Sequence, residues 1–142
     1  MGINTSILGA LEDRVAFAQT SNSSIPSYEQ QENTRTRQGI GQNKLRTTIL
    51  PAKTEISTIG PGGVSKSQGL FQIDVFTPKS EGYNSGREIS DLIVDYFKVG
   101  DVLTKDGIDV IVINTWIATT YFMENVYVTP IKIEWNSWNY RG

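Results

Sequence analysis

The sequence predicts an α+β fold: two helices on one face of an antiparallel or mixed β-sheet, with a long β-hairpin loop and an extended arm. Residues 70–78 alternate between apolar and polar side chains, as a half-buried strand does. Residues 85–99 carry apolar side chains at helical spacing, and further strand-like runs follow. This order of elements is typical of helices that cover one side of a sheet. With 142 residues and no internal repeat, the chain is expected to form a single domain, residues 1–142.

The first expected element is a helix over residues 4–19, with Asn4 as its N-cap. Its apolar residues recur at spacings of about four and form one stripe: Ile3, Ile7, Leu8, Leu11 and Val15. Residues 20–43 follow, with few large apolar residues and no periodicity. Because so long a stretch without structure is unusual inside a compact domain, we expect an extended polar arm that orders against a partner.

A hairpin is expected next, formed by residues 44–52 and 70–78. The buried face of the second strand is expected to carry Phe71, Ile73 and Val75. The opposite, mostly polar face is expected to carry Gln72, Asp74 and Thr77. The glycine-rich stretch between the strands, residues 53–67, is predicted to be the loop at the hairpin tip.

The second helix is expected over residues 85–99, where Ser85 and Glu88 have the spacing of a capping box. Gly100 suits the left-handed position after a helix. Strands are then expected at 101–104, at 108–118 as a largely buried strand, and at 126–135. Pro130 lies within the last strand and predicts an edge position or a bulge there.

The composition argues against an enzyme. The chain contains neither histidine nor cysteine, which are the commonest general base near neutral pH and the source of thiolate chemistry. Gly60–Ser67 approaches a phosphate-binding loop, but Ser65 replaces its second glycine and a strand follows it. Three aspartates, Asp101, Asp106 and Asp109, lack the EF-hand spacing. We therefore predict no catalytic residue, no cofactor and no metal site.

The charges of the chain are unevenly distributed. Residues 35–66 hold six basic residues against Glu55, a net charge of +5, whereas residues 1–34 and 79–142 each have a net charge of −3. Such a chain can associate head to tail or can face a polyanion. A pI near 5.1 argues against a dedicated nucleic-acid binder. No run approaches the roughly 18 apolar residues of a membrane span, so no membrane partner is expected.

Aromatic residues gather near the C-terminus, where Trp135 is expected to close the core, to join an interface patch or to stack on bases. The residues predicted to contact a neighbouring subunit or another partner are Tyr28, Arg35, Arg37, Arg46, Lys53, Lys66, Trp138 and Tyr140. The alternative for the basic members is a channel through which DNA passes. We favour the subunit contact, because repeated basic side chains around a ring would bind DNA strongly.

The order of three segments resembles that of a known family. These segments read LRTTILPA, SQGLFQIDVFTPKSEG and GREISDLIVDYFKVGDVLT, and the likeness covers about residues 44–135. The matching positions are Leu50, Pro51, Ala52, Gly69, Phe71, Gln72, Asp74, Val75, Pro78, Phe97 and Gly100. In this respect the chain resembles the tail terminator, or tail-completion, proteins of long-tailed bacteriophages (the lambda minor tail protein U type).

The resemblance implies a structural virion protein without catalysis, assembled in the host cytoplasm. Its subunits would form a hexameric ring at the head-proximal end of the tail tube. The ring would end tube polymerisation, contact the tube protein, and join the tail to the head-tail connector, with phage DNA passing through its lumen without specific binding. The alternatives are another neck or connector component, a tail-tube subunit, or a module that contacts nucleic acid through residues 35–66.

Overall fold

The computed structural model describes residues 3–22, 44–50, 53–56 and 64–140. Predictions for most of the arm at 20–43 and for the hairpin tip itself therefore lie outside the described residues. The elements, in chain order, are α1 (Ile3–Ser21), β1 (Lys44–Ile49), β2 (Lys53–Ile56), β3 (Val64–Pro78), the short 3₁₀ helix η2 (Lys79–Glu81), α2 (Ser85–Val94), β4 (Val102–Lys105), β5 (Ile108–Ile117), β6 (Tyr121–Met123) and β7 (Val126–Tyr140).

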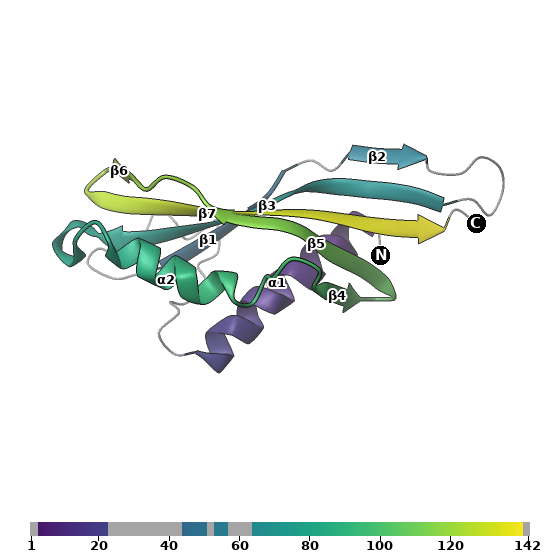
Figure 1. Cartoon of the computed structure of the whole chain (residues 1–142), viewed down its shortest axis with the longest axis horizontal. Coiled ribbons are helices and arrows are strands. Elements are labelled where there is room, and N and C mark those ends of the chain that lie inside the picture. Colours follow the sequence, from purple (N-terminus) through teal and green to yellow (C-terminus); the bar gives the residue numbers. More distant parts are fainter. Residues whose placement is uncertain (1–2, 23–43, 51–52, 57–63, 141–142) are drawn as a thin grey trace.

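The seven strands form one antiparallel sheet with the order β1-β3-β7-β5-β4. The short strands β2 and β6 lie off this path, since β2 pairs with β3 and β6 pairs with β7. Two strands of 15 residues each, β3 and β7, pair along their whole length and form the long axis of the molecule (Figure 1). The predicted α+β class is confirmed, and the described strands pair in antiparallel fashion.

Both helices lie on one face of this sheet (Figure 1), as predicted. The core between the two layers is built from alternate residues of the central strands, Phe71, Ile73, Val75, Ile131, Ile133 and Trp135, none of which is exposed. The helices and the turn after α2 contribute Ile7, Leu11, Val15, Ile89, Ile93 and Phe97. The apolar side chains that recur every three or four residues along the helices therefore pack against those that recur every second residue along the strands, and together they form one apolar layer.

The polar face of β3 differs from its prediction at two residues. Thr77 lies on the face of Val75, beneath α2, because strand residues two apart share a face, and it is fully buried. Asp74 does lie on the helix-free face, but only 1% of it is exposed. Its burial requires partners, and Arg46 and Gln72 supply them.

The hairpin is longer than predicted. The sequence predicts residues 53–56 and 64–67 to lie in the tip loop, yet the first form β2 and the second begin β3, with Lys53 paired to Gln68. Residues 57–63 lie outside the described part. The glycine- and serine-rich start of β3 is extended because it also pairs with the end of β7, where Val64 faces Tyr140. Such a long-range pairing leaves no signal in local composition.

The predicted cap positions of both helices are shifted. Ser85 is the first residue of α2 rather than its cap, and the cap residue is Asn84, which makes no side-chain capping hydrogen bond. Asn4 likewise lies inside α1, which begins at Ile3. At its other end α2 stops at Val94 rather than at residue 99, and tighter turns carry Phe97 into the core.

Pro130 occupies the central strand β7, not an edge or a bulge. Its carbonyl oxygen accepts a hydrogen bond from the Ala118 N–H at 2.8 Å. In an antiparallel strand the N–H and C=O of one residue point to the same side, so the missing donor faces the junction between β5 and β6. The sheet accommodates proline there because neither strand continues its ladder across that point.

Gly86 marks the closest approach of α2 to the sheet. A Cβ atom at this position would lie 2.4 Å from Thr129 Oγ1, and that hydroxyl is hydrogen-bonded to the Thr120 hydroxyl at 2.9 Å. We expect Gly86→Ala to destabilise the fold by about 1–3 kcal/mol through overpacking, although alanine favours helices. Thermal and urea denaturation will measure the change.

The matched control for this prediction is Gly9→Ala in α1. A Cβ atom there meets only the flexible end of the Lys105 side chain, which can move away. We expect this variant to be neutral or stabilised by up to about 1 kcal/mol. Equal effects of the two substitutions would show that Gly86 is not a packing constraint.

Candidate assembly surface

The structure brings together some of the residues predicted for an interface. Lys66 lies opposite Trp138 in the β3–β7 ladder, Val64 lies opposite Tyr140, and Lys53 pairs with Gln68. The backbones of Lys53, Lys66, Trp138 and Tyr140 therefore share one end of the sheet (Figure 1), which we call the β2 end. Tyr28, Arg35 and Arg37 lie outside the described residues.

Lys66 and Trp138 form a cation–π contact on the surface of this end. The Lys66 ammonium lies 5.5 Å from the centre of the Trp138 ring, and 47% of Trp138 is exposed. A contact of this kind at an exposed site stabilises by about 0.5–1 kcal/mol. It holds a large amphipathic ring in a defined position, as expected of a residue that contacts a partner.

Arg46 lies away from the β2 end. Its guanidinium is 3.1 Å from the Asp74 carboxylate and stacks 5.1 Å from the centre of the Phe76 ring. The Gln72 amide donates a second hydrogen bond to that carboxylate at 2.8 Å. Arg46 therefore compensates a buried charge within the fold, and reversing its charge would test stability rather than assembly.

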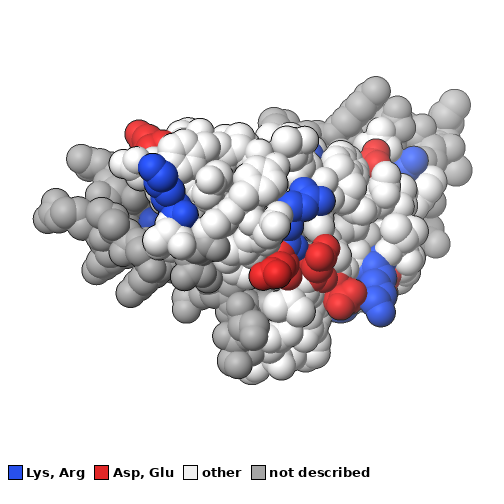
Figure 2. Space-filling model, turned by 60° about the vertical axis from the view of Figure 1, so that its left-hand side comes forward, with Lys and Arg blue, Asp and Glu red and all other residues white. Residues whose placement is uncertain are grey.

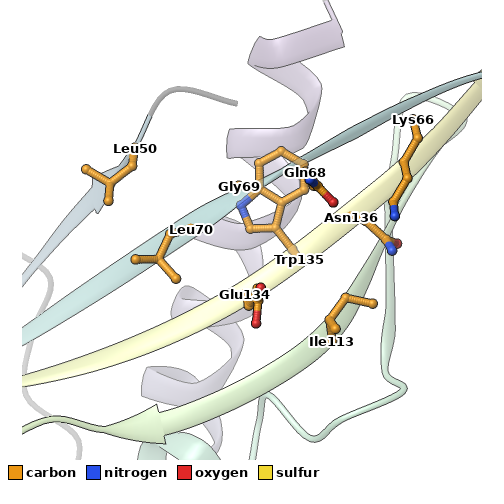
Figure 3. Close-up of a pocket in the computed structure, with 9 residues that line it drawn as sticks. All are labelled: Leu50, Lys66, Gln68, Gly69, Leu70, Ile113, Glu134, Trp135 and Asn136. Atoms are coloured by element: carbon orange, nitrogen blue, oxygen red, sulfur yellow. The ribbon is translucent and has the colours of Figure 1, made fainter. Parts of the chain in front are cut away.

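A hollow of about 420 Å³ opens on the helix-free face of the sheet (Figure 3). Its apolar lining comes from Leu50, Leu70 and Ile113, and Leu50 and Ile113 are each 41% exposed. Lys66 and Glu134 supply one positive and one negative charge. The volume lies in the range of ligand pockets, which are about 300–1,000 Å³.

Two polar atoms at the hollow lack a hydrogen-bond partner within the described part of the chain. They are Nε1 of Trp135, a donor, and Oδ1 of Asn136, an acceptor. The indole of Trp135 is fully buried and lies opposite Gly69, which leaves it room because it has no side chain (Figure 3). Trp135 thus closes the core. The surface of the hollow is formed instead by its neighbours along β7, Glu134 and Asn136.

The hollow was missed by the sequence prediction because its apolar members come from separate segments. Residues 108–118 were expected to be largely buried, but β5 carries a bulge between Val112 and Asn114. Ile113, the residue at this bulge, is 41% exposed, and Trp116 is 40% exposed. A local shift in register cannot be detected from the pattern of one strand.

A second exposed apolar patch lies at the opposite end of β7, and we call it the β6 hairpin. It consists of β6, the turn at Glu124 and Asn125, and the start of β7. All three residues of β6 are exposed, namely Tyr121 (43%), Phe122 (48%) and Met123 (40%). The Phe122 ring packs on Tyr127 at 5.1 Å, and the Lys79 ammonium lies 5.9 Å from the Phe122 ring centre.

The acidic residues considered as metal ligands do not converge. Asp101 accepts a hydrogen bond from the Lys98 backbone N–H, Asp106 from the Ser6 hydroxyl, and Asp109 from the Thr104 hydroxyl. Each carboxylate is thus engaged with a different part of the fold. Over the described ranges no group of three potential metal ligands is present.

Charges of both signs are interspersed on the surface. Figure 2 shows Lys and Arg side chains next to Asp and Glu side chains on the face turned toward the viewer. An ion pair between Lys105 Nζ and Asp13 Oδ2, which are 2.8 Å apart, links β4 to α1. The hydrogen bond that Lys105 donates to the Asp13 carboxylate, followed by the negative charge of Asp13, raises the pKa of Lys105 above its ordinary value. Its small stabilising effect is therefore complete at neutral pH and lost as the pH rises through the raised pKa.

In the described part of the chain, no helix is both long and apolar enough to cross a membrane. A family model described as phage tail terminator protein matches residues 6–135, which include both helices and nearly the whole sheet. The chain belongs to the phage tail terminator family. It is accordingly a structural protein of the bacteriophage virion with a role in tail completion. No curated protein matches the chain.

Solved structures share the fold of this tail terminator. One, whose title states no function, is 17% identical, has a TM-score of 0.66, and is matched over 96% of both chains. A second is a chain of the structure titled "Virion of native gene transfer agent (GTA) particle". It is 11% identical, has a TM-score of 0.51, and the match covers 96% of this chain and 95% of that chain. At these identities the likeness concerns the fold.

Proposed function

We propose that the tail terminator assembles into a hexameric ring at the head-proximal end of the tail tube. There it ends tube polymerisation and joins the tail to the head connector, without catalysis. The observation that carries this proposal is the family match over residues 6–135, which spans almost the entire described fold. Assembly in the host cytoplasm and contacts with the tube protein and connector belong to the same proposal.

The distribution of exposed groups supports a ring. A closed ring built from one repeated contact requires two different patches on each subunit. The hollow near the β2 end and the β6 hairpin are two such patches, and both expose apolar residues. A subunit with a single patch would instead be expected to form a twofold dimer.

The basic residues of 35–66 other than Arg46 are proposed to serve subunit contact, and phage DNA is proposed to pass through the lumen without specific binding. Of the basic side chains described in this segment, Arg46 is paired with Asp74, whereas Lys44 and Lys66 lie over the Phe76 and Trp138 rings. The ion pair withholds Arg46 from phosphates, and DNA binds in proportion to the phosphates that are neutralised. A nucleic-acid module is therefore the weaker alternative.

The mass of the purified chain tests the ring. We expect native mass spectrometry and light scattering to show a sixfold mass, either at high concentration or upon mixing with tail tubes. Terminated tubes should then no longer elongate when tube protein is added. A chain that stays monomeric under both conditions, or tubes that grow past it, would contradict the proposal.

A further inference from the structure

We propose that the hollow on the helix-free face receives the β6 hairpin of a neighbouring copy of this chain, with Phe122 as the inserted side chain. This inference rests on the proposed ring and names the contact that closes it. Two intermolecular ion pairs accompany the insertion: Lys79 with Glu134, and Glu124 with Lys66. The contact is heterologous, so it repeats from subunit to subunit around a ring.

The hollow has the properties of a receptor for a protein segment. Its apolar lining includes the exposed side chains of Leu50 and Ile113. An apolar side chain that enters the hollow removes this surface, and its own, from water. A hairpin that carries an exposed aromatic residue supplies such a side chain.

The β6 hairpin has the properties of the inserted element. Its turn residues, Glu124 and Asn125, both have positive φ angles, which is typical of a tight two-residue hairpin that projects as a defined unit. Phe122 is half exposed although its ring is held in place by Tyr127. An aromatic ring positioned in advance loses little conformational freedom on binding, which favours affinity.

The hairpin cannot reach the hollow of its own chain. Both lie on β7, where β6 pairs at residues 126–128 while the hollow is lined by residues 134–136. Six strand residues separate them by about 20 Å along one continuous ladder with β3. Since this pairing holds the two ends of β7 apart, a β6 hairpin that fills the hollow must belong to a second molecule.

The charges of the two patches are complementary. The hairpin carries Lys79 beside the Phe122 ring and Glu124 at its turn. The hollow carries Glu134 and Lys66, so each charge on one patch has an opposite charge on the other. Complementary charges fix the register of an interface and exclude wrong partners.

Charge reversal tests the pairing directly. We expect Lys79→Glu and Glu134→Lys each to raise the concentration needed for ring assembly at least tenfold, since each places like charges together. The double variant should assemble as the wild type does. Matched controls are Lys98→Glu and Asp91→Lys, which reverse exposed charges elsewhere and should assemble normally. A double variant no better than the single ones would overturn the proposal.

The Phe122→Ala variant tests the insertion itself. We expect it to weaken ring assembly at least tenfold, as truncation of a central aromatic anchor does. Val99→Ala is the matched control, because Val99 is 66% exposed and lies outside both patches. Thermal melting will verify that each variant is folded.

The outcomes distinguish this inference from the proposed function. If Phe122→Ala rings form normally, the inference is overturned while the ring remains. If those rings form but no longer bind tail tubes, the hairpin belongs to the tube contact and the inference is likewise overturned. If the wild-type chain never assembles, even with tubes, both proposals fall.

Discussion

Replacing Trp135 by alanine should lower the free energy of unfolding by about 3–5 kcal/mol, the range for removing a large aromatic side chain from a core. The side chain is fully buried and is one of the largest in the core. It faces Gly69 on β3 and Val112 on β5. Since Gly69 has no side chain to move inward, the cavity cannot collapse from that side. Urea denaturation followed by circular dichroism will measure the loss.

Trp138→Ala is the matched control for this prediction. Trp138 lies three residues further along β7, on the opposite face, and is nearly half exposed. Its replacement removes the contact with Lys66 and should cost about 1 kcal/mol at most. If the two tryptophan variants lose the same stability, Trp135 does not have the core role assigned to it.

Replacing Arg46 by methionine should destabilise the fold by about 2–3 kcal/mol. The substitution keeps an apolar side chain beside Phe76. It removes one of the two described partners of the Asp74 carboxylate, so that Gln72 remains. Only 1% of Asp74 is exposed. Removing one member of a buried ion pair usually costs about 3–5 kcal/mol. We expect less here, because Arg46 is about one-third exposed and solvent screens the pair.

A second variant separates the buried charge from general packing. The double variant Arg46→Met with Asp74→Asn should recover most of the lost stability, since no unpaired charge remains. Lys132→Met, which removes a partly exposed cation from β7 on the same face, is the control and should change stability by less than about 1 kcal/mol. A loss in Arg46→Met no greater than in this control would contradict the role of Arg46.

Part of the candidate surface could be predicted. Lys66 and Trp138 were selected from charge and aromatic content, and the register of β3 and β7 places them in contact. The interface role of both remains a prediction. Arg46 was selected for the same reason as Lys66, but its neighbours made it a structural residue. The positions of charged residues in the sequence do not reveal which residue lies next to each of them on the neighbouring strand. That neighbour decides whether a charged side chain stabilises the fold or remains available for an interface.

The β6 hairpin and the hollow could not be predicted. Three residues are too few to show a period, so β6 gave no strand signal. The hollow depends on Leu50, Gly69 and Ile113, which come from three separate parts of the chain and are adjacent only after the sheet has formed. The bulge at Ile113 is likewise a property of the paired strands.

The sequence by itself determined the α+β class, the two helices and the buried face of β3 at Phe71, Ile73 and Val75. These features follow from local periodicity and from backbone preferences within a few residues. Only the tertiary structure decided how far β3 extends, where α2 is capped, why Pro130 is tolerated, and which cation neutralises Asp74. Each of these depends on a residue distant in the chain, and pairing across a sheet depends on neighbours that no single strand encodes.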